Sequence, residues 1–176
     1  FIFGFSQLGS HCGTVGLHAA IDINGVAYWM GRDSFFKFDG TVLKIPCSVE
    51  DYVFTDIDEA NQKDVFAAAN GEFNEVTWFY PTNGASQVDR CVTYNIKEDV
   101  WQVGTLARTS WADKGVYNFP YATTYAPTDT ASTITTITGL TAGRTYMYAQ
   151  EKGNNADGAA MTSYVESGDF VIPQGG

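Results

Sequence analysis

The sequence predicts a mostly β protein made of short antiparallel strands, with one short helix. Three observations lead to this fold class: short apolar and aromatic runs, Asn-Gly or Asp-Gly dipeptides between them, and a recurrence of the whole pattern along the chain. The 176 residues include 12 Phe, 10 Tyr, 4 Trp and 18 Gly. Aromatic residues at alternate positions suit a sheet covered by a neighbouring sheet, and glycine suits tight turns. We therefore expect kelch-type antiparallel β-propeller blades that are incomplete within this chain.

The first predicted blade occupies residues 19–45. Asn24-Gly25 and Asp39-Gly40 are hairpin signals, because both residues of such a dipeptide readily adopt positive φ. Around these dipeptides the apolar pattern predicts four strands, at residues 19–23, 25–30, 34–38 and 41–45. Four antiparallel strands within about thirty residues have the size of one propeller blade.

The second predicted blade repeats this arrangement about 50 residues later, which is the period of kelch-type repeats. Its expected strands are residues 64–69, 74–80, 90–95 and 99–106, with Asn70-Gly71 as one turn and a polar loop at 81–89. Residues 26–29 align with residues 76–79 in this overlay. A single four-stranded sheet cannot bury both of its faces, so the repeat predicts sheets that stack on one another.

The rest of the chain carries weaker signals. Residues 56–63 predict the one short helix, with Asp56 or Asp58 as its N-cap. The two blades then occupy residues 1–121, a Thr-rich insertion occupies 122–144, and a partial third blade occupies 145–176, with strands at 145–150 and 161–166. Residues 139–146 resemble the tyrosine-corner stretch of fibronectin type III domains, but a whole domain of that kind needs about 100 residues.

The chain ends and the composition exclude several classes. The aromatic start, residues 1–5, predicts a buried strand and suggests a piece of a longer polypeptide, and residues 171–176 predict a strand that runs into a turn. Acidic residues outnumber basic ones 20 to 10, which disfavours phosphate binding and hence a nucleic-acid-binding domain. No run approaches the ~20 apolar residues of a membrane span. Three widely spaced cysteines argue against a disulfide framework.

Metal, nucleotide and nucleophile sites find no support in the residue spacing. His11, Cys12 and His18 lie together, but an adjacent His-Cys pair is a poor chelate, and Ser10 belongs to no nucleophile motif. No glycine-rich phosphate loop precedes a helix. Residues 22–25 and 155–158 are similar to fragments of calcium loops but lack the acidic ligand at the twelfth position, and turns explain them fully. We predict no cofactor, metal or catalytic residue.

Two side-chain sets leave other functions open. A glycosidase could draw two carboxylates from the acidic region or from Glu75 and Asp89. Strand aromatics could instead line a sugar-binding site. The acidic region comprises Glu50, Asp51, Asp56, Asp58, Glu59 and Asp64, and the aromatics are Tyr28, Trp29, Trp78, Phe79, Tyr80, Tyr94, Trp101 and Trp111. A solvated acidic surface and a stacked aromatic core are the simpler interpretations of the two sets.

A train of motifs runs along nearly the whole chain, at residues 27–35, 45–47, 51–54, 73–81, 89–95, 101–111 and 164–170. These motifs resemble those of virion proteins of tailed bacteriophages. The likeness is greatest to the tail nozzle, or packaged-DNA stabilisation, proteins of short-tailed phages. The Thr-rich residues 126–141 depart from that pattern.

This resemblance implies a non-enzymatic structural protein with a β-propeller fold. Proteins of this kind form a ring, usually hexameric, beside the portal, adaptor and other tail proteins, hold the packaged DNA and later let it pass. The virion tail is then the expected location, after assembly in the host cytoplasm. Carboxylates beside DNA repel phosphate, so an acidic chain suits such a conduit. Residues 81–89 and 107–138 are the expected inter-subunit contacts. The alternatives are a carbohydrate-binding tail adhesin and a propeller-type glycosidase.

Overall fold

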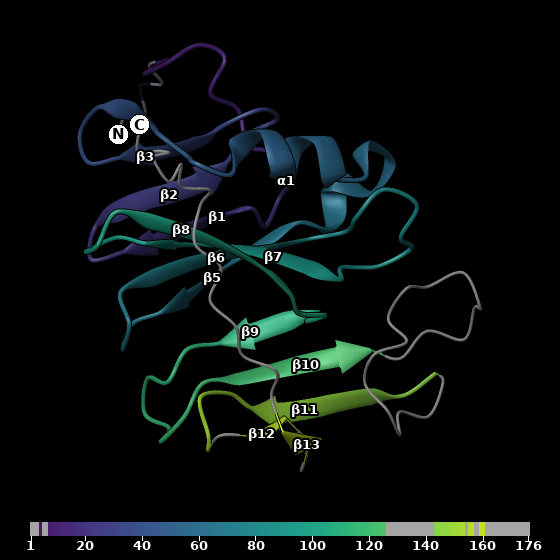
Figure 1. Ribbon diagram of the computed structural model, residues 1–176. Coiled ribbons are helices and arrows are strands. Elements are labelled where there is room, and N and C mark those ends of the chain that lie inside the picture. Colours follow the sequence, from purple (N-terminus) through teal and green to yellow (C-terminus); the bar gives the residue numbers. More distant parts are fainter. Residues whose placement is uncertain (1–3, 5–6, 126–142, 154, 157–158, 161–176) are drawn as a thin grey trace, which may run out of the picture.

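The computed structural model describes residues 4, 7–125, 143–153, 155–156 and 159–160. Within these residues the chain is mostly β, and every paired strand of its sheets is antiparallel. Two four-stranded sheets and a three-stranded sheet lie one above another (Figure 1). The predicted fold class is therefore confirmed at the level of a mostly β, antiparallel protein.

The first sheet is a meander in the strand order β1-β2-β3-β4. Its first hairpin has Asn24 at φ 54° and Gly25 at φ 82°, and the Gly25 N–H donates to the Asp22 carboxylate at 3.3 Å. This is the turn that the Asn-Gly dipeptide predicts, and it accounts for the calcium-like fragment. The strands, each within one residue of its predicted bounds, are β1 (Ala20–Ile23), β2 (Val26–Met30), β3 (Phe35–Phe38) and β4 (Val42–Ile45).

The second sheet repeats the meander in the order β5-β6-β7-β8. Its first turn is a four-residue loop in which Asn74, rather than Gly71, has positive φ (58°). A second left-handed residue, Asp99 (φ 55°), ends the loop before the last strand. The strands, all within two residues of the predicted bounds, are β5 (Phe66–Asn70), β6 (Glu75–Tyr80), β7 (Arg90–Asn95) and β8 (Val100–Thr105).

The predicted overlay of the two repeats is one residue out of register in the second strand. It aligned Trp29 with Phe79, yet Trp29 pairs with Phe36 on the face turned away from the second sheet. The residue in the matching position is Trp78, which pairs with Val92 on the face turned toward the first sheet. Because side chains alternate between faces, a shift of one residue sends every side chain to the other side.

Two short helices connect the first two sheets, where the sequence predicted one at residues 56–63. The first, α1 (Glu50–Asp56), was missed, and the second is a 3-10 helix, η1 (Glu59–Asp64). Asp58 caps η1 by accepting the Ala60 N–H at 2.8 Å, so this half of the N-cap prediction is confirmed. Burial of Val53 explains α1, since its side chain enters the core between the two sheets.

The third sheet, in the order β11-β10-β9, begins inside the region assigned to the first two blades. It also moves the predicted boundary of the Thr-rich insertion, because residues 122–125 are strand residues of β10. The elements are β9 (Ser110–Ala112), β10 (Tyr121–Tyr125), β11 (Thr145–Ala149) and a small hairpin of β12 (Asn155–Ala156) with β13 (Ala159–Ala160). The strand at 145–150 is thereby confirmed; the predictions for residues 126–142, 161–166 and 171–176, and all but Gly4 of 1–5, lie outside the described residues.

Packing between the sheets makes a core in two parts. The larger cluster lies between the first and second sheets and includes Tyr28, Met30, Phe35, Trp78 and Tyr80. The smaller cluster lies on the other face of the second sheet, around Phe79 and Cys91, with Trp111 of the third sheet packed against it. The second sheet is therefore covered on both faces.

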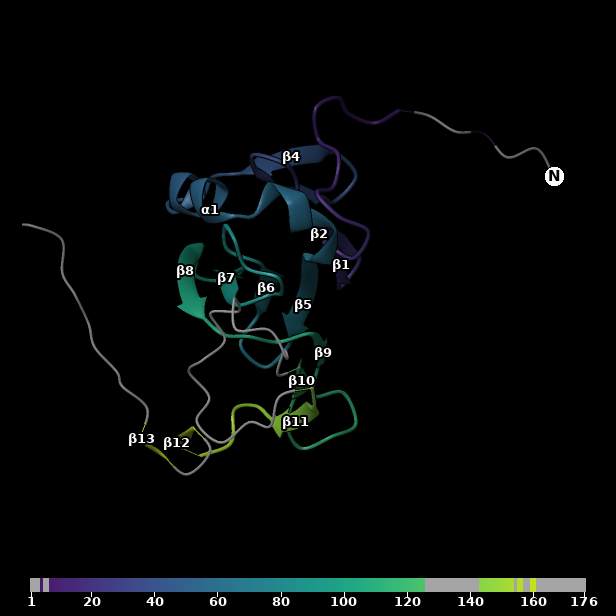
Figure 2. The same ribbon diagram turned by 90° about the vertical axis from the view of Figure 1, so that its right-hand side faces the viewer.

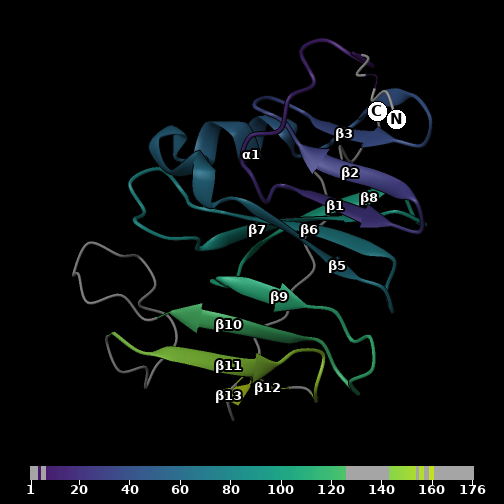
Figure 3. The ribbon, with the colours of Figure 1, turned by 180° about the vertical axis from the view of Figure 1, so that it is seen from behind.

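The first strands of the three sheets lie along one side of the stack (Figures 2 and 3). They begin at residues 20, 66 and 110, so equivalent strands recur about every 45 residues. β5 contacts both β1 and β9, and residues 18 and 66 form a parallel bridge in which the Ala67 N–H donates to the His18 carbonyl at 2.8 Å. Among the described residues, no helix is long and apolar enough to cross a membrane.

Candidate functional site: a hollow beside the first strands

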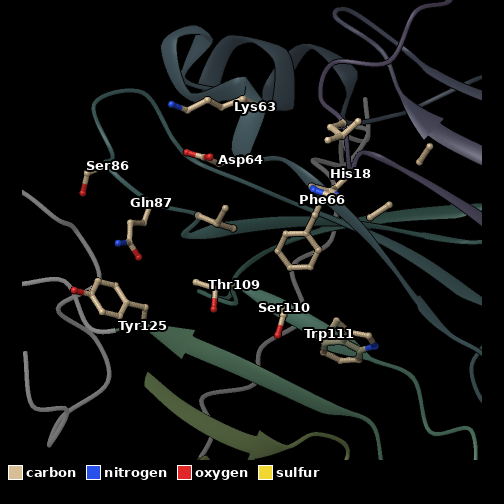
Figure 4. Close-up of a pocket in the computed structure, with 14 residues that line it drawn as sticks. His18, Lys63, Asp64, Phe66, Ser86, Gln87, Thr109, Ser110, Trp111 and Tyr125 are labelled. Atoms are coloured by element: carbon tan, nitrogen blue, oxygen red, sulfur yellow. The ribbon is translucent and has the colours of Figure 1, made fainter. Parts of the chain in front are cut away.

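A hollow of about 770 Å³ opens on the side of the stack where β1, β5 and β9 lie (Figure 4). Its wall combines residues from five separated parts of the chain: the start of β1 and the segment before it, the end of η1 with β5, the loop 81–89, β9 with its flank, and the end of β10. The residues that line it are Leu17, His18, Ala20, Lys63, Asp64, Phe66, Ala67, Ser86, Gln87, Val88, Thr109, Ser110, Trp111 and Tyr125. The volume lies in the usual range of ligand pockets.

Two of the three aromatic residues in this wall, Phe66 and Trp111, pack on the second sheet. Phe66 stacks on buried Phe79, with ring centroids 4.8 Å apart and planes 13° apart, and Trp111 packs on the same Phe79 at 5.9 Å. The Trp111 indole N–H donates to the Ala69 carbonyl at 2.9 Å, which fixes the orientation of the ring. Both rings are half-buried and border the hollow.

The polar part of the wall is provided by the end of η1 and by the loop 81–89. Lys63 and Asp64 are exposed, and the Gln87 Oε1 is shielded from solvent without a hydrogen-bond partner. The loop that carries Gln87 is held by Asp89, which accepts the Thr82 N–H and the Thr82 hydroxyl, both at 2.8 Å. The hollow thus has a polar rim above an aromatic wall.

The acidic region does not converge on this hollow, because Asp64 is the one member that lines it. The Asp56 carboxylate receives the Tyr80 hydroxyl at 3.4 Å and lies 4.0 Å from Arg90, while Asp58 caps η1. Glu50 forms a 2.8 Å ion pair with Lys44 at the surface. Asp51 and Glu59 are exposed. Apart from Asp64, these carboxylates lie on or beside the two helices and do not share a cleft. This agrees with the simpler interpretation of the set, a solvated acidic surface.

The other carboxylate candidates, Glu75 and Asp89, lie apart from the hollow's lining. Burial, with a smaller effect of the Glu151 charge, raises the pKa of Glu75 at the start of β6. Asp89 is buried, and each of its two carboxylate oxygens accepts a hydrogen bond from Thr82. A glycosidase needs two carboxyl groups across one cleft, and the hollow offers Asp64 alone.

His11, Cys12 and His18 are not brought together as ligands. Across the part of the chain that the structure describes, no three His, Cys, Asp or Glu residues are placed to hold a metal ion. Cys12 contributes its carbonyl, which accepts the Trp29 indole N–H at 2.7 Å. The three cysteines are free thiols.

Most of the candidate sugar-binding aromatics are core residues. Tyr28, Trp78, Phe79, Tyr80 and Tyr94 are buried. Trp101 stacks between neighbours and donates its N–H to the Pro46 carbonyl at 2.9 Å, and Trp29 stacks on Phe36. Of that set, Trp111 alone lines the hollow. The sequence interpretation did not select Phe66 or Gln87, whose place in the wall depends on contacts with distant segments.

Arg108 is a buried cation between the second and third sheets, with 8% of its surface exposed. Its guanidinium donates to the Ala107 carbonyl at 2.9 Å and the Thr124 hydroxyl at 3.0 Å, and lies 5.0 Å from the centroid of the Tyr148 ring. Desolvation lowers the pKa of Arg108. Arg108 therefore joins the segment before β9 to β10 and β11.

We expect the buried Cys91 thiol to make stability depend on alkaline pH. Desolvation raises its pKa from 9.0 to about 11. The unfolded thiol ionises first as pH rises past 9, so the free energy of unfolding falls between pH 9 and 11. Between pH 8 and pH 11, the free energy of unfolding measured with urea should fall by about 2 kcal/mol less for Cys91→Ala than for the native chain. Identical pH slopes for the two proteins would contradict this assignment.

A comparison of the chain with models of known protein families finds no match, and a comparison with curated protein sequences finds none either.

Proposed function

We propose that the chain is a non-enzymatic structural subunit of a bacteriophage tail, of the nozzle type, which assembles into a ring around the DNA exit channel. The observation that carries the proposal is the repeated sheet architecture. Two four-stranded meanders and a third sheet stack face to face, with their first strands in contact on one side. Such repetition is the arrangement of propeller blades. The motif train that resembles nozzle proteins supports the same function.

The propeller itself is part of this proposal. A closed propeller needs at least about four blades, and the described residues provide two four-stranded sheets and one of three strands. We propose that further blades come from additional chain or from neighbouring subunits. The loop 81–89 and the stretch 107–138, which contains β9 and β10, remain the proposed contacts between subunits. The exposed tip of the first loop is residues 83, 84 and 86.

The charge of the chain favours a conduit that DNA passes without adhering. The formal net charge is −10, and Asp89 is the one acidic residue that is buried among the described residues. The other described carboxylates are at least partly exposed and present negative charge to their surroundings. Surface carboxylates repel a phosphate backbone, whereas a basic surface would retain it.

Native mass spectrometry of the purified chain, alone and with duplex DNA, tests the proposal in solution. We expect a ring, hexameric or a simple multiple, that does not retain DNA at low salt. The same preparation with duplex RNA serves as a matched polyanion control. A stable monomer under all conditions, or a DNA complex that dissociates as salt increases, would count against the ring or the conduit respectively.

The glycosidase alternative has less support than the structural one. Asp64 is the single carboxylate in the lining of the hollow, and the Asp89 carboxylate accepts two hydrogen bonds from Thr82. The adhesin alternative has one observation in its favour, the aromatic wall of the hollow.

A further inference from the structure

We infer that the hollow beside β1, β5 and β9 is a binding site for a neutral saccharide of one or two pyranose units. The inference is independent of the proposed tail function, because it rests on the wall of the hollow alone. It also places the ligand on two rings that border the hollow, Phe66 and Trp111, rather than on the buried aromatic residues of the core.

The aromatic rings suit the apolar face of a sugar. Phe79 covers one face of Phe66, since the two rings are nearly parallel at 4.8 Å, and the rest of Phe66 borders the hollow. Trp111 is anchored through its N–H to Ala69 and cannot turn away without breaking that bond. Fixed rings lose little entropy on binding, and the C–H groups on one side of a pyranose form a flat apolar surface that packs on such rings.

The polar rim suits hydroxyl groups. The Gln87 side chain lines the hollow, and its amide group can both donate and accept. The Asp64 carboxylate is an exposed acceptor on the same wall, and the Ser110 hydroxyl, which already shares a 2.7 Å hydrogen bond with the Thr123 hydroxyl, keeps capacity for a second one. Figure 4 shows Gln87, Asp64 and Ser110 around the space, with Phe66 and Trp111 at one end of it.

The charges of the wall favour a neutral ligand over an anion. Lys63 and Asp64 are the lysine and the carboxylate of the lining, and they are adjacent, so their fields largely cancel. A phosphate or nucleotide would find no net attraction there, and the chain as a whole carries a formal charge of −10. The volume of about 770 Å³ accommodates one or two sugar rings.

Saturation-transfer NMR with the whole chain tests the inference against a defined panel. The probes are maltose, cellobiose, lactose and N-acetylchitobiose, each alone and with inorganic phosphate as competitor. We expect at least one disaccharide to bind with a Kd of about 1 mM or tighter. Asp64→Asn exchanges a charged acceptor for a neutral amide, and Gln87→Ala removes the amide, so each should weaken that binding about tenfold. Phosphate should not compete.

Asp51→Asn is the matched control, because Asp51 is an exposed carboxylate on α1 outside the hollow, and it should bind like the native chain. Circular dichroism of each variant checks that the fold is retained. The inference is overturned if no disaccharide binds at about 10 mM, if binding survives either hollow substitution unchanged, or if phosphate displaces the sugar.

Discussion

Replacing Trp78 by alanine should lower the free energy of unfolding by about 3–5 kcal/mol, the usual cost of truncating a fully buried aromatic residue. Trp78 has no exposed surface and lies in the core between the first two sheets, 4.9 Å from Phe35 and 6.1 Å from Trp101 between ring centroids. Its indole N–H also crosses to the first sheet and donates to the Ala19 carbonyl at 3.0 Å. The substitution therefore removes packing and a bond between sheets together. Urea unfolding followed by far-UV circular dichroism measures the loss.

Two further variants separate these contributions. Trp78→Phe keeps most of the apolar area, and the Ala19 carbonyl still accepts the Met30 N–H at 3.0 Å, so we expect a loss of about 1–2 kcal/mol. Tyr117→Ala is the control, since that side chain is 57% exposed, and should change stability by less than about 0.5 kcal/mol. A loss below about 1 kcal/mol for Trp78→Ala would contradict the packing of the first two sheets described above.

Asp89→Ala should cost about 2–4 kcal/mol, because it removes two hydrogen bonds to a buried charged group. Asp89 is 7% exposed, and both of its oxygens are 2.8 Å from Thr82 donors. Without them the Thr82 N–H loses its acceptor, and the loop 81–89 should loosen. Hydrogen exchange of the Thr82 and Ala85 amides, together with urea unfolding, measures both effects.

The isostere Asp89→Asn retains one acceptor oxygen and should lose less stability, about 1–2 kcal/mol. Asp51→Ala, at an exposed carboxylate, is the control with no expected loss beyond about 0.5 kcal/mol. If Asp89→Ala were as stable as the native chain, the anchoring role would be wrong, and the case for a catalytic carboxylate at this position would reopen.

The strands of the first two sheets were predictable because their signals are local. The alternating residues of β2 follow the turn that Asn24-Gly25 predicts, and those of β6 follow the four-residue loop 71–74, so each strand and its loop are defined within a few residues. Which side chains of those strands point toward the neighbouring sheet was not predictable from one sequence. Val26 and Val76 look equivalent from their neighbours in the sequence, yet the pairings of Trp29 with Phe36 and of Trp78 with Val92 make Trp78 the counterpart of Trp29. Only contact with the neighbouring sheet distinguishes the two registers.

The third sheet and the hollow depend on contacts that no short window contains. β9 has three residues, too few for a strand pattern, and pairs with β10 across a loop that spans residues 113–120. The hollow joins His18, Asp64, Gln87 and Trp111, which are far apart in the sequence. Asp64 and Trp111 belonged to sets that the sequence singled out, and Gln87 lies in the loop 81–89, but nothing in the sequence distinguished Gln87 from the rest of that loop. An unpartnered amide oxygen becomes visible only in the folded chain.

The most direct test of the central proposal is the composition and structure of the phage particles in which the proposal places this chain. Quantitative mass spectrometry gives the number of copies per particle, and cryo-electron microscopy gives their position. We predict six copies, or a small multiple of six, in a ring at the tail, with the stacked sheets around the DNA channel. Virions that lack the chain altogether, or a channel wall lined mainly by its lysines and arginines, would contradict the account.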